Sequence, residues 1–244
     1  EANPRLSDGW NQLGTALEGA GRYEEASDVY KEIIDVTPEL ASEFGLRRAS
    51  VLLKLEQYDE AEKHARLAER TNASAMHLVL SRVALAKKDF ARAESEARAA
   101  AADPNDRNAA ELLIAQALSQ QGKAQEAYAL VQQVGVRLSQ EGGGAMERFD
   151  YVRGDALARM ERYDEAMAAF RREIANFPDY RQTYANLYLI YVVLNRRAEA
   201  NAVLEEMVRA GPGKQTMLFA ARTVGALGDD NGEREWKRRA AAAR

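Results

Sequence analysis

The sequence contains no cysteine among its 244 residues. This absence excludes a disulfide framework, thiolate metal sites and a cysteine nucleophile. There are only two histidines, His64 and His77, which leaves little for imidazole-based metal binding or acid–base chemistry. The sequence therefore predicts a non-catalytic protein with no metal and no cofactor.

Positive charge and long apolar runs are also scarce. The formal net charge is −4, which argues against nucleic acid as a partner, because nucleic-acid binding needs clustered positive charge. No apolar run approaches the ~20 residues that span a membrane. The chain begins at Glu1 without a basic and apolar leader, so any targeting signal is expected outside this sequence, and the cytoplasm and the periplasm both stay open.

What the sequence has in quantity is alanine, arginine and a repeated segment. The abundance of alanine, with arginine as the main basic residue, suggests a GC-rich bacterial source. A turn followed by a helix start recurs six times, for example as Gly21–Ala26 and Arg162–Ala166. The alanines that close these segments are residues 26, 61, 93, 127, 166 and 200, so their spacings are 35, 32, 34, 39 and 34. Self-similarity at a fixed period of this size predicts a stack of repeated units.

The first unit resembles the tetratricopeptide repeat, whose period is 34 residues. Counted from Ser7, eight residues stand at the offsets typical of that family. These residues are Trp10, Leu13, Gly14, Leu17, Tyr23, Ala26, Tyr30 and Pro38. The units that begin at Glu147 and Arg181 keep much of the same pattern.

Helix geometry explains these offsets. Repeat positions 4, 7, 8 and 11 form one face of a first helix, and positions 20, 24 and 27 form the facing stripe of a second. Small residues at positions 8 and 20 let the two helix backbones approach, and the proline near position 32 ends the pair. The sequence thus predicts an all-α, right-handed superhelical solenoid of six to seven helix hairpins, each burying the apolar surface of its neighbour.

The 39-residue spacing predicts an interruption. Extra residues fall at 141–146, which include Gly142, Gly143 and Gly144, and three adjacent glycines do not favour a helix. We expect units 1–4 over residues 1–140, a glycine-rich insertion at 141–146 that is a hinge or a tolerated surface insertion, and units 5 and 6 with a degenerate seventh hairpin over 147–244. For that last hairpin we expect helices over Gln215–Leu227 and Glu233–Ala243. Residues Glu1–Leu6 read as the tail of an earlier unit or as a lead-in segment.

Several motifs that suggest chemistry have a simpler structural interpretation. The segment Gly211–Thr216 lacks the spacing of a phosphate-binding loop, and Asp229–Gly232 lacks the first and last ligands of a calcium loop. His64 is expected to be exposed on a second helix, whereas His77 occupies a packing position. The tyrosines 184, 188 and 191 lie at i, i+4 and i+7 and favour core packing over a ligand site.

The family resemblance implies that the first helix of each unit lines a concave groove. Its lining positions imply twelve partner-binding residues: Leu46, Arg47, Lys54, Leu78, Arg82, Leu112, Gln116, Arg148, Tyr151, Asp155, Arg159 and Asn186. Leu46, Leu78, Leu112 and Tyr151 form an apolar strip, and the arginines beside it can grip carboxylates in a bidentate manner. The resemblance therefore implies a protein or peptide partner with acidic and apolar residues.

Two other functions stay open at this point. Units 5–7 look similar to the repeat tails of bacterial sulfatase-like hydrolases, which implies an accessory region of a larger enzyme. Exposed apolar end faces of the stack would instead favour self-association.

Overall fold

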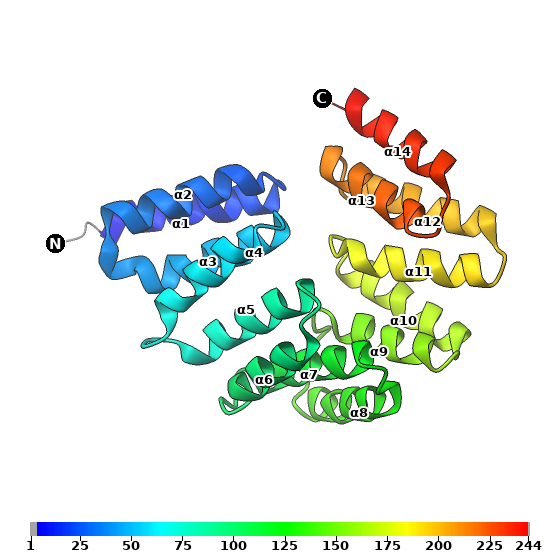
Figure 1. Ribbon diagram of the computed structural model, residues 1–244. Coiled ribbons are helices and arrows are strands. Elements are labelled where there is room, and N and C mark those ends of the chain that lie inside the picture. The colour runs from blue at the N-terminus through cyan, green and yellow to red at the C-terminus, as the bar shows by residue number, and fades with distance from the viewer. Residues whose placement is uncertain (1–3, 244) are drawn as a thin grey trace. The chain divides into compact units, whose positions relative to one another are not determined.

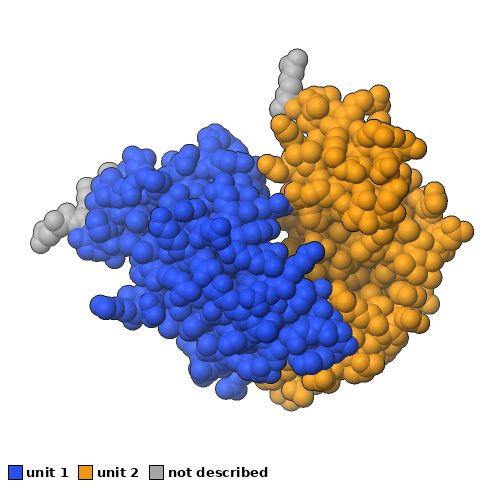
Figure 2. All heavy atoms as spheres, viewed as in Figure 1, with its two compact units in different colours: residues 1–123 blue, residues 124–244 orange. Residues whose placement is uncertain are grey.

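The structure is a computed structural model that describes residues 4–243, with side chains from Gly9 onward. Of the segment Glu1–Leu6, the first three residues lie outside this description, and the remainder begins the first helix. All regular structure over residues 4–243 is helical, as the repeat predicts. The described chain forms two compact units, residues 1–123 and 124–244 (Figure 2).

The first compact unit, which spans several repeats, contains seven α-helices (Figure 1). From here on, the first and second units are these compact units. They are α1 (Pro4–Gly19), α2 (Tyr23–Val36), α3 (Ala41–Lys54), α4 (Tyr58–Ala65), α5 (Ala73–Ala86), α6 (Phe90–Ala100) and α7 (Arg107–Gln120). Short 3₁₀ turns at Pro38–Leu40 and Arg66–Ala68 follow α2 and α4. Each helix packs against the next along the chain, and the first helices of the pairs also meet, α3 with α5 and α5 with α7.

The second unit contains the other seven helices of the described chain. They are α8 (Ala124–Gln140), α9 (Phe149–Arg159), α10 (Tyr163–Asn176), α11 (Arg181–Val193), α12 (Arg197–Ala210), α13 (Lys214–Gly225) and α14 (Asp230–Ala242). Here α9 packs against α10 and α11, and α11 packs against α12 and α13. The repeat order of the sequence is thus the packing order within each unit.

Glycine at repeat position 8 brings the two helices of a pair together. A Cβ added to Gly154 would lie 2.6 Å from the ring of Phe170, and one added to Gly14 would lie 2.4 Å from the ring of Tyr30. Both rings are fully buried and both stand at repeat position 24. In the third repeat, Ser81 takes the same position and donates its hydroxyl proton to the carbonyl oxygen of Ala93, at 2.8 Å. The small residue predicted at position 8 therefore has a direct structural cause.

The turn inside each pair is closed by a left-handed residue. Gly122 has φ = +83°, and Glu56, Lys88, Glu161 and Asn195 have φ between 57° and 61° at the equivalent turns. Around Glu56, Gln57 N donates to Leu52 O and Glu56 N donates to Leu53 O, which is the Schellman pattern of helix ends. These turns are hard to recognise from the sequence, because glycine occupies only some of the positions.

We expect Gly122→Ala to lower the free energy of unfolding by about 1 kcal/mol, since a Cβ is strained at a left-handed φ. Urea denaturation followed by circular dichroism measures this change. Gly9→Ala, inside α1 with nothing within 4 Å of the added Cβ, is the matched control and should be neutral or stabilising. Equal destabilisation by the two variants would contradict the role given to the turn.

The division expected at 141–146 stays a prediction, whereas the start expected for the last helix is corrected by the structure. The glycine-rich segment lies in a non-helical stretch, residues 141–148, between α8 and α9, whereas the two compact units divide earlier, between Lys123 and Ala124. The start expected for the last helix, Glu233, was wrong. The helix begins at Asp230, because the side chain of Asp229 accepts a hydrogen bond from Gly232 N at 2.9 Å and caps its first turn.

Candidate functional site

The candidate site in each unit is the row of first helices: α3, α5 and α7 in the first unit, and α9, α11 and α13 in the second. We call the residues at lining positions on these helices the inner surface of that unit. All twelve residues implied by the resemblance lie on these rows or, for Arg148, at the residue that precedes α9.

On the inner surface of the first unit, the apolar residues are partly used for packing. Leu46 and Leu78 are half-buried, and Leu46 contacts the core of the second repeat. Leu112 and the amide side chain of Gln116 are buried, at 3% and 8% exposure. The apolar strip expected from sequence therefore offers Leu46 and Leu78 to solvent in part, while Leu112 belongs to the interior.

The basic residues of this surface gather on α3. The side chain of Arg47 is 39% exposed and lies 3.7 Å from Glu43, one turn earlier. Exposed Lys54 places its Nζ 4.8 Å from the ring centroid of Tyr23, a cation–π contact that holds the lysine at the surface. Arg82 on α5 is half-buried and already has an interaction partner. Positive charge is therefore available mainly at Arg47 and Lys54.

On the inner surface of the second unit, five implied residues converge. Arg148 donates from Nη2 to the hydroxyl of Tyr180 at 2.5 Å and stacks on that ring at 4.6 Å. The rings of Tyr151 and Tyr180 meet edge to face at 4.8 Å, a favourable arrangement for aromatic pairs. We call the whole group the α9–α11 cluster. Its members are Arg148, Tyr151, Asp155, Arg159, Tyr180 and Asn186.

Asp155 ties the two helices of this cluster together. Its Oδ1 accepts from Asn186 Nδ2 at 3.3 Å, and its Oδ2 accepts from Arg159 Nε at 3.1 Å. Asp155 is 5% exposed, so these bonds satisfy a carboxylate that water reaches poorly. Part of the charge of Arg159 is therefore committed inside the cluster.

A buried glutamate on α10 sets the position of α9. The Oε1 of Glu173 accepts from Arg148 N at 2.7 Å, and its Oε2 accepts from Tyr151 N at 3.2 Å. The two N–H groups belong to the otherwise unpaired first turn of α9. Glu173 is only 1% exposed, and this burial raises its pKa above 4.5. One carboxylate thus fixes the backbone that carries both Arg148 and Tyr151.

Tyr151 remains a neutral hydroxyl in this setting. Burial, followed by the proximity of Tyr180, raises its pKa well above 10. A tyrosine with a raised pKa serves as a hydrogen-bond donor and a ring surface rather than as a base. Tyr151 is only 2% exposed, so the cluster offers the Arg148 cation, the half-buried Tyr180 ring and the Asn186 amide for recognition, with Tyr151 as their buried packing partner.

Both histidines have structural partners. His64 was expected to be exposed, and this was wrong: its side chain is 11% exposed, and Arg48 Nη1 lies 2.7 Å from its Nε2. Burial, with a further effect of Arg48, lowers its pKa below 6.5. Arg48 and His64 together occupy a position where the repeat usually carries an apolar residue. His77 is partly exposed and bonds Glu96 through Nδ1 at 2.7 Å.

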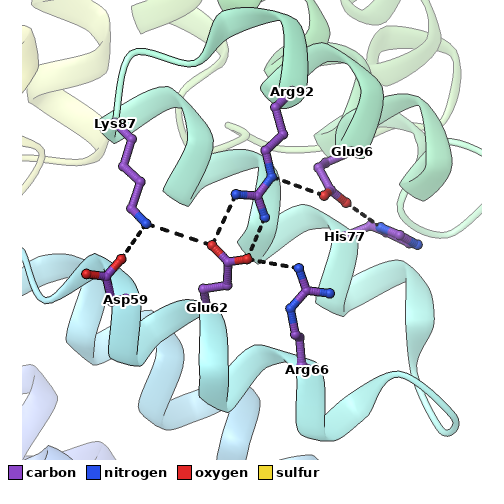
Figure 3. A network of polar contacts seen from close by, with 7 residues as sticks. All are labelled: Asp59, Glu62, Arg66, His77, Lys87, Arg92 and Glu96. Carbon is purple, nitrogen blue, oxygen red and sulfur yellow. Dashed lines mark hydrogen bonds and ion pairs between the residues drawn. The ribbon is translucent and has the colours of Figure 1, made fainter.

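His77 lies at the edge of a larger polar network in the first unit (Figure 3). Glu62 on α4 accepts from Arg92 on α6 at 2.7 Å and from Arg66 at 2.9 Å. Arg92 continues to Glu96, and Lys87 joins α5 to Asp59. The network links the second repeat to the third through α4 and α6.

We expect Glu62→Gln to lower the free energy of unfolding by about 1–2 kcal/mol at neutral pH. Hydrogen bonding from Arg92, with a further contribution from Arg66, lowers the pKa of Glu62 to about 2. The folded state thus holds the Glu62 proton more weakly than the unfolded state does, so this stabilisation is present above pH 4.5 and is lost as the pH falls from 4.5 toward 2. Denaturation of both proteins at pH 7 and pH 3 measures it. A difference that does not shrink at pH 3 would contradict this assignment.

Neither a metal site nor a membrane span is found among the described residues. No group of three histidine, aspartate or glutamate side chains there is placed to hold an ion. Within the same part of the chain, no helix combines the length and the apolar character needed to cross a bilayer.

Comparison with known proteins agrees with this architecture. The tetratricopeptide repeat family model matches residues 11–75, 46–107 and 151–215, which together cover more than half of the chain. The chain belongs to the tetratricopeptide repeat family. Curated protein sequences give no match.

Solved tetratricopeptide repeat structures resemble the chain in fold. One from Parabacteroides merdae has a TM-score of 0.56 at 12% identity, covering 97% of this chain and 92% of its own. The thermophilic repeat protein TTC0263 from Thermus thermophilus has a TM-score of 0.60 at 20% identity, covering 81% and 98%. The APC/C hetero-tetramer Cut9–Hcn1 gives 0.66 at 14% identity, covering 95% of this chain and 42% of that one. At these identities the likeness concerns the fold alone.

Two residues that build the α9–α11 cluster were not predicted from the sequence. Glu173 stands at repeat position 27, where an apolar residue is usual in this family, so a carboxylate there was the available signal. Tyr180 lies one helical turn before the tyrosine series 184, 188 and 191 and was given no role. The three tyrosines of that series are buried in the core, whereas Tyr180 is half-buried and bonds Arg148.

Proposed function

We propose that this tetratricopeptide repeat protein is a non-catalytic scaffold that binds a peptide or protein segment on its inner surface. The observation that supports this most directly is the α9–α11 cluster, in which buried Glu173 fixes the backbone of Arg148 and Tyr151, and Arg148 in turn bonds the hydroxyl of Tyr180. Side chains held in place before binding lose less conformational entropy when a partner arrives.

The proposed partner carries acidic and apolar residues. Arg47 and Lys54 supply positive charge on α3, and partly exposed Leu46 and Leu78 lie on the same row of helices. Guanidinium groups bind carboxylates with two parallel hydrogen bonds, and tyrosine and arginine are enriched at the residues that carry binding energy in interfaces. The remaining proposed contacts are Arg82, Arg148, Arg159 and Asn186, whereas Leu112, Gln116, Tyr151 and Asp155 are buried and would act by supporting the contact residues.

A selection from displayed random peptides, followed by binding measurements on purified protein, tests this proposal. We expect selected peptides to share acidic residues next to an apolar residue. Arg47→Glu/Lys54→Glu should weaken their binding about tenfold or more. Lys63→Glu/Arg70→Glu changes net charge equally at exposed residues away from the inner surface and should bind as the wild type does. Equal loss in both double variants would overturn the proposal.

A further inference from the structure

The glycine-rich insertion forms one wall of a pocket within the second unit. Residues 141–148 pass between the end of α8, the start of α9 and the end of α10, and the pocket that they help to enclose has a volume of about 220 Å³. The insertion interrupts the 34-residue period at this point, so the other repeats lack the equivalent loop.

The walls of the pocket combine apolar side chains with a comparable share of polar surface. Leu138, Met146, Phe149 and Phe177 line it, together with the backbone of the glycine segment. Gly135 on α8 permits this shape, because a Cβ there would lie 2.9 Å from Phe149 Cζ. The ring of Phe149 therefore lies directly against the α8 backbone and leaves space beside it.

Three polar side chains lie among the lining residues, and the hydroxyl of one, Ser139, is used in a bond to Gly135 O at 2.9 Å. Asp150 Oδ1 accepts from Arg172 Nε at 3.0 Å and from Arg172 Nη2 at 2.8 Å. Both bonds use the same oxygen, so Oδ2 remains an acceptor. Asn176 donates through Nδ2 to Arg172 O at 3.0 Å, which leaves its amide oxygen as a second acceptor. The pocket thus pairs apolar side chains with hydrogen-bond acceptors and a carboxylate.

Size and chemistry together define the occupant. A cavity of roughly 150 Å³ holds a benzene ring, whereas drug-sized ligands and cofactors occupy about 300–1,000 Å³. One ring system fits, and the acceptors of Asp150 and Asn176 favour a ring that carries an N–H or O–H donor. Because a single ring offers few atoms for binding, tight attachment requires further contacts from the chain that carries it.

We propose that this pocket, separate from the inner-surface residues proposed above, takes the side chain of a tryptophan or tyrosine from a partner protein. The ring packs between Phe149, Phe177 and Met146, and its donor faces Asp150. An aromatic anchor in a preformed pocket is a common source of binding energy in protein interfaces.

Nuclear magnetic resonance titration of the full chain tests this assignment with N-acetyltryptophanamide as the side-chain probe. We expect saturable shifts of the Gly143, Gly144 and Asn176 signals, with a Kd on the order of 1 mM. Ala145→Phe, which fills the pocket from its lining, should weaken binding about tenfold or more. Val136→Phe adds the same ring at an exposed residue of α8 that does not line the pocket and should leave binding unchanged.

Two further measurements test separately the hydrogen bond to Asp150 and the source of the aromatic ring. Asp150→Asn should weaken binding of N-acetyltryptophanamide several-fold while leaving binding of N-acetylphenylalaninamide, whose side chain carries no hydrogen-bond donor, unaffected. Absence of saturable pocket shifts, or equal binding by Ala145→Phe, would overturn the assignment. Binding of free indole without binding of N-acetyltryptophanamide would show a site for a free small ring and would overturn the side-chain source.

Discussion

Replacing Phe170 with alanine is expected to lower the free energy of unfolding by about 3–5 kcal/mol. The ring is fully buried, packs 6.1 Å from the ring of Tyr151 and fills the space that Gly154 leaves open. Its removal creates a cavity between α9 and α10 that their backbones cannot close. Urea denaturation followed by circular dichroism measures the loss, and Leu189→Ala, at a residue 36% exposed on α11, is the control with little expected effect.

Enlarging Gly154, on the other side of the same contact, should also lower the free energy of unfolding. Gly154→Ala adds a Cβ at 2.6 Å from the Phe170 ring, so we expect a loss of about 1–3 kcal/mol despite the better helix propensity of alanine. In the double variant Gly154→Ala/Phe170→Leu, the smaller side chain makes room for the methyl group, and the combined loss should be less than the sum of the single losses. Additive losses would show that the two residues do not form one packing unit.

The second large effect is expected from Glu173→Ala, which should lower the free energy of unfolding by about 3 kcal/mol. The substitution leaves Arg148 N–H and Tyr151 N–H without their acceptor, and each buried unsatisfied donor costs about 1–3 kcal/mol. Hydrogen exchange of these two amides should accelerate together with the loss of stability.

A second carboxylate on α10 provides the matched control. Glu165 is exposed, and its ion pair with Arg162 lies at the surface, where such pairs contribute little to stability. Glu165→Ala should therefore leave the free energy of unfolding and the exchange of the two amides close to their wild-type values. The same result for Glu173→Ala would contradict its capping role.

The pH dependence of this position has a definite sign. Burial raises the pKa of Glu173 above 4.5, so the folded state binds the Glu173 proton more tightly than the unfolded state does. The contribution of Glu173 to stability therefore falls as the pH rises from 4.5 through the raised pKa. Glu173→Gln should remove this decline, in the opposite direction to the effect described for Glu62.

The fold could be predicted well from the sequence because the same packing contacts recur from repeat to repeat. The glycine at position 8, the aromatic residue at position 24 and the closing alanine all occupy the roles that their spacing predicts. The start of α14 was misjudged because Asp229 acts as a cap, a role that aspartate in a turn shares with many non-helical contexts. Left-handed turns closed by glutamate or lysine were missed because these residues rarely adopt such a conformation.

The inner surface could be predicted only in part. The repeat register placed Arg148, Tyr151 and Asp155 on one row, and the structure brings them together with Arg159 and Asn186. It could not show that Leu112 is buried, that Arg82 already has a partner or that Glu173 reaches α9 from α10. Such contacts depend on side chains of different helices, whose pairing no single repeat position encodes. The sulfatase-like resemblance, the hinge role of residues 141–146 and self-association stay predictions.

Site-specific photo-crosslinking tests the central functional proposal most directly. A photoreactive amino acid is placed at Lys54, on the inner surface of the first unit, or at Lys63, an exposed lysine on α4, and each protein is irradiated with a selected peptide. We expect adducts from position 54 and none from position 63. Adducts from position 63, with none from position 54, would contradict binding on the inner surface.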